Sequence, residues 1–240
     1  RRMGHILVGG FRHDPTLLAL IQKFLSDEAA ELIPAWMRGA EERKASESPA
    51  VSRANSILAF EEDAQAQALA KEGGGLVKEL MAAGRADSAE ELVNVLLGFV
   101  RDRSTSRRLL ACEALEGIRA SAAAALPETM VTAVESRVRG ALQAEKEAPV
   151  YTKLSELTAA FIDARIRREE LARAAELLEP LRKHYQVKEA GFPQRVELAF
   201  HALERIASGA GFSVLMDRVQ AQDPAAYAVV ESLDAAATRF

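Results

Sequence analysis

The chain has 240 residues, of which 49% are hydrophobic and only 5% aromatic, and its formal net charge is −4 at pH 7. That length is enough for one large domain or two small ones. Abundant alanine and scarce aromatic residues favour closely packed helices, because strands prefer β-branched and aromatic side chains. The acidic balance argues against a nucleic-acid-binding protein, which needs a basic excess to contact phosphates.

The single cysteine, Cys112, excludes a disulfide within the chain and any metal site built from several cysteines. A reducing compartment, the cytoplasm, is therefore the expected location. No apolar run approaches the roughly 18 residues that a membrane-spanning helix needs. The first ten residues, RRMGHILVGG, lack the apolar length and the cleavage site of a secretory signal. We expect no contact with a membrane.

Residues 1–75 are expected to form an N-terminal helical region. Asp14 can cap a first helix and Pro15 suits its first position. The polar stretch 39–50 has no periodicity and predicts a mobile linker. The segment SRANSILAFEEDAQAQALAKE then predicts one helix, which the three glycines Gly73, Gly74 and Gly75 are expected to end.

From residue 76 to the end, helical segments alternate with short breaks. We predict four pairs of helices, over residues 87–119, 127–166, 169–207 and 211–238. Pro180 lies inside the third pair, where we expect it to bend or shorten a helix.

One pattern occurs twice in these pairs, first in RRLLACEALEGI and again in QRVELAFHALERI, 88 residues later. Each copy has an arginine, an alanine four residues on, Ala-Leu at seven and eight, and isoleucine at eleven. These offsets fall on one face of a helix, so each set predicts a buried stripe. The two stripes are Arg107, Ala111, Ala114, Leu115 and Ile118, and Arg195, Ala199, Ala202, Leu203 and Ile206.

A third copy is expected midway, in YTKLSELTAAFIDARI, where two registers remain open. Counting from Lys153 gives Leu157, Ala160, Phe161 and Ala164, whereas counting from Tyr151 gives Ser155, Thr158, Ala159 and Ile162. The last predicted helix satisfies the spacing loosely with Ala225, Val229, Ser232, Leu233 and Ala236.

Helical hairpins that recur about every 40 residues resemble α-solenoids of the HEAT and armadillo kind. The second-helix pattern, an arginine followed by A..AL..I, is similar to the HEAT repeat in particular, and Asp102 in the preceding turn adds to the likeness. The third pair has Ala190 at the matching position instead. The resemblance covers roughly residues 87–240 and implies an all-α fold, an α-solenoid (superhelix) of stacked antiparallel helical hairpins over residues 76–240. Tetratricopeptide repeats fit less well, since their period is about 34 residues.

The sequence shows no catalytic pattern. The histidines, His5, His13, His184 and His201, are not spaced as metal ligands, and the glycine triplet lacks the lysine of a phosphate-binding loop. No local motif activates Cys112 as a nucleophile. Two arginine clusters, at residues 101–108 and 165–168, lie at helix ends among carboxylates, which favours a structural role. We therefore predict no enzyme activity, no cofactor and no metal.

The predicted function is a non-catalytic scaffold of HEAT-like repeats that binds another protein on a concave surface. One alternative is a HEAT-like nucleic-acid-binding protein of the DNA-glycosylase type, against which the acidic balance and the scarce aromatic residues argue. The other is a compact helical module for regulation or oligomerisation.

In a HEAT-like stack the second helix of each pair lines the concave face. The positions two, six and nine residues after the repeat arginine would then face a partner: Leu109, Glu113 and Glu116 in one copy, and Glu197, His201 and Glu204 in the other. Four of the six are acidic, which predicts a basic segment as the partner. The alternative is that these glutamates only keep exposed helix faces soluble.

Overall fold

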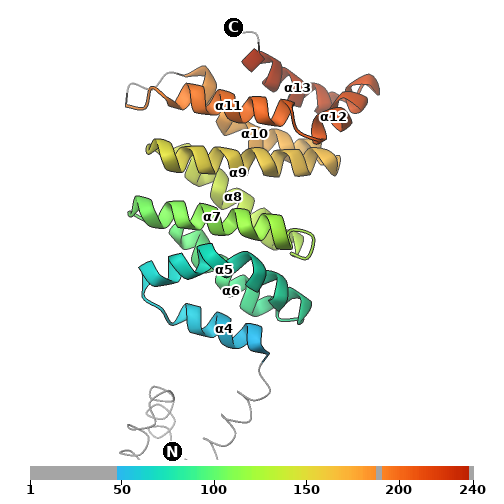
Figure 1. Ribbon diagram of the computed structural model, residues 1–240. Helices are drawn as coiled ribbons and strands as arrows, with labels where there is room; N and C mark the ends of the chain where they lie inside the picture. The colour runs from blue at the N-terminus through green and yellow to red at the C-terminus, as the bar shows by residue number, and fades with distance from the viewer. Residues whose placement is uncertain (1–47, 188–190, 238–240) are drawn as a thin grey trace, which may run out of the picture. The chain divides into compact units, whose positions relative to one another are not determined.

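The structure is a computed structural model that describes residues 48–187 and 191–237. Its secondary structure is entirely α-helical in these residues, so the all-α class is confirmed (Figure 1). The chain divides into two compact units, Arg1–Ser52 and Arg53–Phe240, and the second holds nearly all of the described residues. Most of the predicted N-terminal region, including His5, His13 and nearly all of the linker at 39–50, lies outside the described residues.

The described helices are α4 (Pro49–Leu58), α5 (Glu62–Ala82), α6 (Ala86–Phe99), α7 (Thr105–Ala122), α8 (Glu128–Ala144), α9 (Ala148–Arg167), α10 (Leu171–Gln186), α11 (Arg195–Ala207), α12 (Gly211–Gln220) and α13 (Pro224–Ala237). The last eight match the four predicted pairs, with bounds that differ by at most three residues. Pro180 lies inside α10 and does not shorten it.

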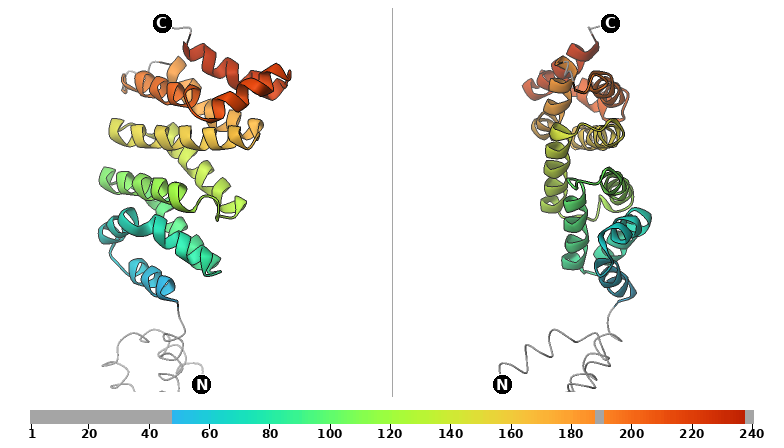
Figure 2. Two further views of the ribbon diagram at one scale, coloured as in Figure 1. Left: turned by 45° about the vertical axis from the view of Figure 1, so that its right-hand side comes forward. Right: turned by 90° about the vertical axis from the view of Figure 1, so that its left-hand side faces the viewer.

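The helices of the second unit lie in two layers, as the views in Figures 1 and 2 agree. The first layer holds α5, α7, α9 and α11, each packed against the next, and the second layer holds α6, α8 and α10 in the same way. Contacts of α6 with α5 and α7, of α8 with α9, and of α10 with α9 and α11 join the layers. The last pair differs, because α12 packs on α9 while α13 packs on α10 and α11.

The segment before α6 corrects two predictions. The expected single helix is two, α4 and α5, separated by a turn, and α5 continues through the glycine triplet instead of ending there. The triplet is helical because α5 lies very close to α7: a Cβ on Gly74 would stand 2.5 Å from the carbonyl carbon and oxygen of Gly117. Packing between helices thus outweighs the low helix propensity of glycine. The proposed boundary after residue 75 falls inside α5.

The apolar residues of the repeated stripes are buried as predicted, and so is Arg195, whereas Arg107 is only half-buried. Ala111 and Leu115 on α7, and Ala199 and Leu203 on α11, are each at most 2% exposed. In the last pair, Val229 and Leu233 are buried too.

The structure also settles the register of the third copy, on α9. Five residues counted from Tyr151 are each at most 2% exposed: Tyr151, Ser155, Thr158, Ala159 and Ile162. Lys153, the rival anchor, is exposed. The hydroxyl groups of Ser155 and Thr158 donate to carbonyl oxygens of their own helix, at 2.9 and 2.7 Å, so they can be buried without other partners. The stripes on α7, α9 and α11 therefore begin at residues 107, 151 and 195, 44 residues apart.

A buried ion-pair network joins α8, α9 and α10. Arg165 donates to both carboxylate oxygens of Glu135, at 2.7 and 3.0 Å, and these two residues are 3% and 1% exposed. Arg173 on α10 reaches the same carboxylate at 3.2 Å. Arg165 also pairs with Glu128 and Glu170. The arginine cluster at 165–168 thus has a structural role at Arg165.

Candidate interaction surface

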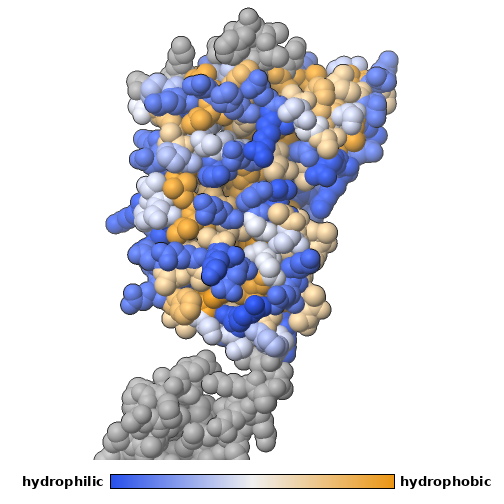
Figure 3. All heavy atoms as spheres, in the orientation of Figure 1, coloured by the Kyte–Doolittle hydropathy of each residue, from blue (hydrophilic) through white to orange (hydrophobic). Residues whose placement is uncertain are grey.

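The six predicted partner-binding residues all lie on the first layer. Glu113 and Glu116 on α7 are exposed, as are Glu197, His201 and Glu204 on α11, whereas Leu109 is half-buried. The structure does not bring the two groups together, because α9 lies between α7 and α11 (Figure 1). Figure 3, which views this layer from outside, shows mostly hydrophilic residues with apolar ones between them.

Two ion-pair systems partly neutralise this face. Arg119 binds Glu116 on its own helix in a bidentate pair, with distances of 2.7 and 2.6 Å. Glu156 on α9 lies 3.6 Å from Lys153 and 3.5 Å from Arg205 of α11. These salt bridges are exposed and screened by solvent, so a partner can replace them at small cost.

The sequence reasoning missed these basic residues. With α9 counted from Tyr151, the position two residues on is Lys153, which corresponds to Leu109 and Glu197 in the other copies. The 44-residue spacing was the signal that could have found it. The face is therefore acidic on α7 and α11 and carries a lysine on α9.

The α11 residues form a small cluster of their own. His201 Nδ1 lies 3.1 Å from Glu204 Oε2, and its Nε2 lies 3.9 Å from Glu197 Oε1. These contacts become ion pairs only when the imidazole is protonated. Glu113 makes no ion pair with any described residue. Three glutamates, Glu113, Glu197 and Glu204, are thus not paired with a permanent cation.

The arginines that begin the stripes on α7 and α11, Arg107 and Arg195, are structural residues. Arg107 pairs with Glu62 and, at 2.6 Å, with Asp63, so it ties the start of α7 to the start of α5. It also lies 3.4 Å from Asp102, in the turn before α7.

Arg108, next to Arg107, and the stripe arginine Arg195 together hold the turn between α8 and α9. Arg108 binds the buried carboxylate of Glu145 at 2.9 and 3.2 Å, and Arg195 donates to the carbonyl oxygen of Gln143 at 2.9 Å. The Arg195 guanidinium also lies 5.7 Å from the centre of the Tyr151 ring, within cation–π range. These contacts join neighbouring helix pairs at one end of the first layer.

Two described residues with reactive side chains, Cys112 and Tyr151, are held in the core. Burial, with a smaller contribution from Glu145, raises the pKa of the Cys112 thiol to about 12. The thiol is therefore protonated at neutral pH and is a poor nucleophile. Burial likewise raises the pKa of Tyr151, whose hydroxyl lies 3.0 Å from His184 Nδ1. Within residues 48–187 and 191–237, no three His, Cys, Asp or Glu side chains are grouped to hold a metal ion.

No protein-family model matches the sequence, and comparisons with curated proteins and with solved structures gave no match. None of the described helices is both long enough and apolar enough to cross a membrane.

Proposed function

We propose that this protein is a non-catalytic scaffold of HEAT-like repeats that binds another protein through the exposed face of its first layer. The observation that carries the proposal is the recurrence of one buried stripe on α7, α9 and α11 at intervals of 44 residues, on three helices that are neighbours in one layer. A recurring stripe is what stacked hairpins need, because a single hairpin cannot bury its apolar face alone. A single cysteine, Cys112, that is buried in the core fits a reducing compartment such as the cytoplasm.

The solenoid part of the proposal is tested by small-angle X-ray scattering of the full chain. A compact globule of this length has a radius of gyration of about 18 Å. An α-solenoid extends along one axis, so we expect a clearly larger radius and an asymmetric distance distribution. A distribution typical of a sphere would favour the compact regulatory module instead.

The binding part rests on charge. A basic segment of a partner would find Glu113 on α7 and the pair Glu197 and Glu204 on α11, and would compete with Lys153 for Glu156. Such rim charges steer association more than they hold a complex together. We therefore expect their removal to slow association and to flatten its dependence on salt.

The experiment uses a partner isolated with the full chain as bait and compares two double variants. Glu113→Lys with Glu204→Lys reverses two charges on the first layer, and Glu90→Lys with Glu91→Lys makes the same change on exposed positions of α6 in the second layer. Only the first variant should slow association, while both keep the helical circular dichroism and melting temperature of the parent. Equal rates for the two variants would leave the glutamates as solubilising residues only. Turnover of a substrate by the purified chain would overturn the scaffold proposal itself.

A further inference from the structure

The second layer carries a row of three arginines whose side chains make no hydrogen bond or ion pair with a described residue. Arg101 follows α6, Arg139 lies on α8 and Arg182 lies on α10, three helices that are successive neighbours. Most arginines of the first layer differ from them: Arg107, Arg108 and Arg119, for example, all bind carboxylates.

The three arginines follow one another from helix to helix. The Arg101 guanidinium lies against Gly140, the residue next to Arg139 on α8, where a β-carbon would collide with it. Arg139 and Arg182 in turn both act electrostatically on the carboxylate of Glu179. The row thus runs from the end of α6 across α8 to α10.

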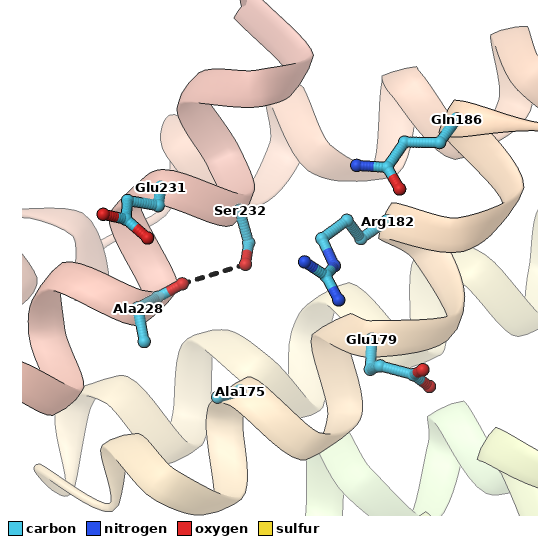
Figure 4. A pocket seen from close by; sticks show the side chains of 7 residues that line it. All are labelled: Ala175, Glu179, Arg182, Gln186, Ala228, Glu231 and Ser232. Carbon is cyan, nitrogen blue, oxygen red and sulfur yellow. Dashed lines mark hydrogen bonds between the residues drawn. The ribbon is translucent and has the colours of Figure 1, made fainter.

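The row ends at a cleft of about 400 Å³ between α10 and α13 (Figure 4). Arg182 and Gln186 point from α10 into this space, whereas Glu179 and Glu231 point away from it. The Ser232 hydroxyl, on the opposite wall, donates to the carbonyl oxygen of Ala228 at 2.9 Å. The cleft is lined by Ala175, Glu179, Arg182, Gln186, Ala228, Glu231 and Ser232.

The nearby carboxylates leave Arg182 available. Glu179 accepts a hydrogen bond from Lys183 at 2.6 Å, and this bond is the main reason for its lowered pKa, ahead of Arg139 and Arg182. Glu231 makes no ion pair with a described residue and is directed out of the cleft. The guanidinium of Arg182 therefore presents a planar set of N–H donors to the cleft, a geometry that matches a carboxylate.

We propose that this cleft and the arginine row bind an extended acidic segment of a partner protein. One carboxylate of the segment enters the cleft and accepts hydrogen bonds from Arg182 and Gln186. Further carboxylates lie along Arg139 and Arg101, across α8. The inference goes beyond the proposed function, because it assigns a second surface, of opposite charge preference, to the other layer.

The test is fluorescence anisotropy of a labelled hexaglutamate peptide with the full chain. We expect binding that weakens as salt rises, because exposed charge pairs are screened. Arg182→Gln should weaken it about three- to fivefold, the usual range for one exposed charge pair, and Arg139→Gln with Arg182→Gln should weaken it further. Arg182→Lys, which keeps the charge but loses the planar donors, should fall between the parent and Arg182→Gln.

The matched control is Lys71→Gln with Arg85→Gln, which removes two positive charges from exposed positions away from the row. If this control weakens peptide binding as much as the Arg139 and Arg182 double variant, the site is wrong and only the net charge matters. Tighter binding of a single-stranded DNA of equal charge would also overturn the proposal, since the site would then favour phosphate. A hexalysine peptide reports on the first layer, so its failure to bind would count against the proposed function and not against this cleft.

Discussion

Two contacts between neighbouring helices of this protein are built in opposite ways. The contact between α5 and α7 is made by residues without side chains: Gly74 lies so close to Gly117 that the two backbones are in contact. Between α8, α9 and α10, large charged side chains are kept, and Glu135 is buried with Arg165 and Arg173 bound to its carboxylate.

The difference teaches how each contact can fail. A glycine contact depends on shape alone, so an atom added to Gly74 must push two helices apart. A buried ion pair is stable only when both partners are present, because loss of one partner leaves an uncompensated charge in the core. Substitutions at the two contacts should separate these cases.

Replacing Glu135 with leucine should have the largest effect. The change leaves Arg165 buried with its main partner gone, and breaking such a pair costs about 3–5 kcal/mol. Glu128 and Glu170 remain near Arg165, so we expect a value towards the lower end. Urea unfolding measures the loss. Glu176→Gln, which removes an exposed partner of Arg173, is the control and should stay within about 0.5 kcal/mol. Equal losses for both variants would show that the network is not buried.

The glycine contact can be tested with one substitution at three positions. Gly74→Ala places a methyl group against the backbone of Gly117 and should cost about 1–3 kcal/mol. Gly75→Ala meets nothing within 4 Å and should stabilise the helix by about 0.5–1 kcal/mol. Gly117→Ala meets Gly74 only at 4.0 Å, an ordinary contact, so it should gain helix propensity in the same way and stabilise its helix by a similar amount. Thermal melting of the three variants should therefore place Gly75→Ala and Gly117→Ala above the parent and Gly74→Ala below it.

These two contacts also show what could be predicted from the sequence. The helix pairs after residue 86 were predictable because apolar periodicity and the repeated stripe point to the same helix faces. The glycine triplet was misread as a helix end, since local propensity says nothing about Gly117, which lies more than 40 residues further along the chain. The ion pair between Glu135 and Arg165 could not be predicted from the sequence either, because neither residue interrupts the apolar pattern that indicates a buried helix face.

The candidate surface was predictable only in part. The exposure of Glu113 and Glu204 followed from their place opposite a buried stripe. The ion pairs of Glu156 with Lys153 and Arg205 did not, because the polar residues Ser155 and Thr158 hid the stripe on α9. Polar residues predict exposed positions. These two are buried nevertheless, because their hydroxyl groups bond to carbonyl oxygens of their own helix.

The register of α9 can be tested by substitution. This helix is linked to both contacts, because it packs on α7 and carries Arg165. Ala159→Phe should overpack the stripe counted from Tyr151 and cost about 1–3 kcal/mol, whereas Lys153→Ala should change stability by less than about 0.5 kcal/mol. Chemical denaturation gives both values. A phenylalanine at 159 that leaves the unfolding midpoint unchanged would contradict the 44-residue spacing and, with it, the proposed repeat.

Acid should distinguish the charged network from the glycine contact, and this is the smallest effect that we expect. The hydrogen bond from Arg165 is the main cause of the lowered pKa of Glu128, at the edge of the charged network. A pKa that is lower in the folded state gives stability that is present above the ordinary value of 4.5 and is lost as the pH falls through the folded-state pKa.

Because Glu128 is largely exposed, its contribution is at most about 1 kcal/mol. Glu128→Gln should therefore lower the melting temperature slightly at pH 6, and the variant and the parent should converge once the pH falls below the folded-state pKa of Glu128. Gly74→Ala contains no titrating group, so its difference from the parent should persist across the same range. If the Gly74→Ala difference also vanished in acid, the two contacts would not be independent.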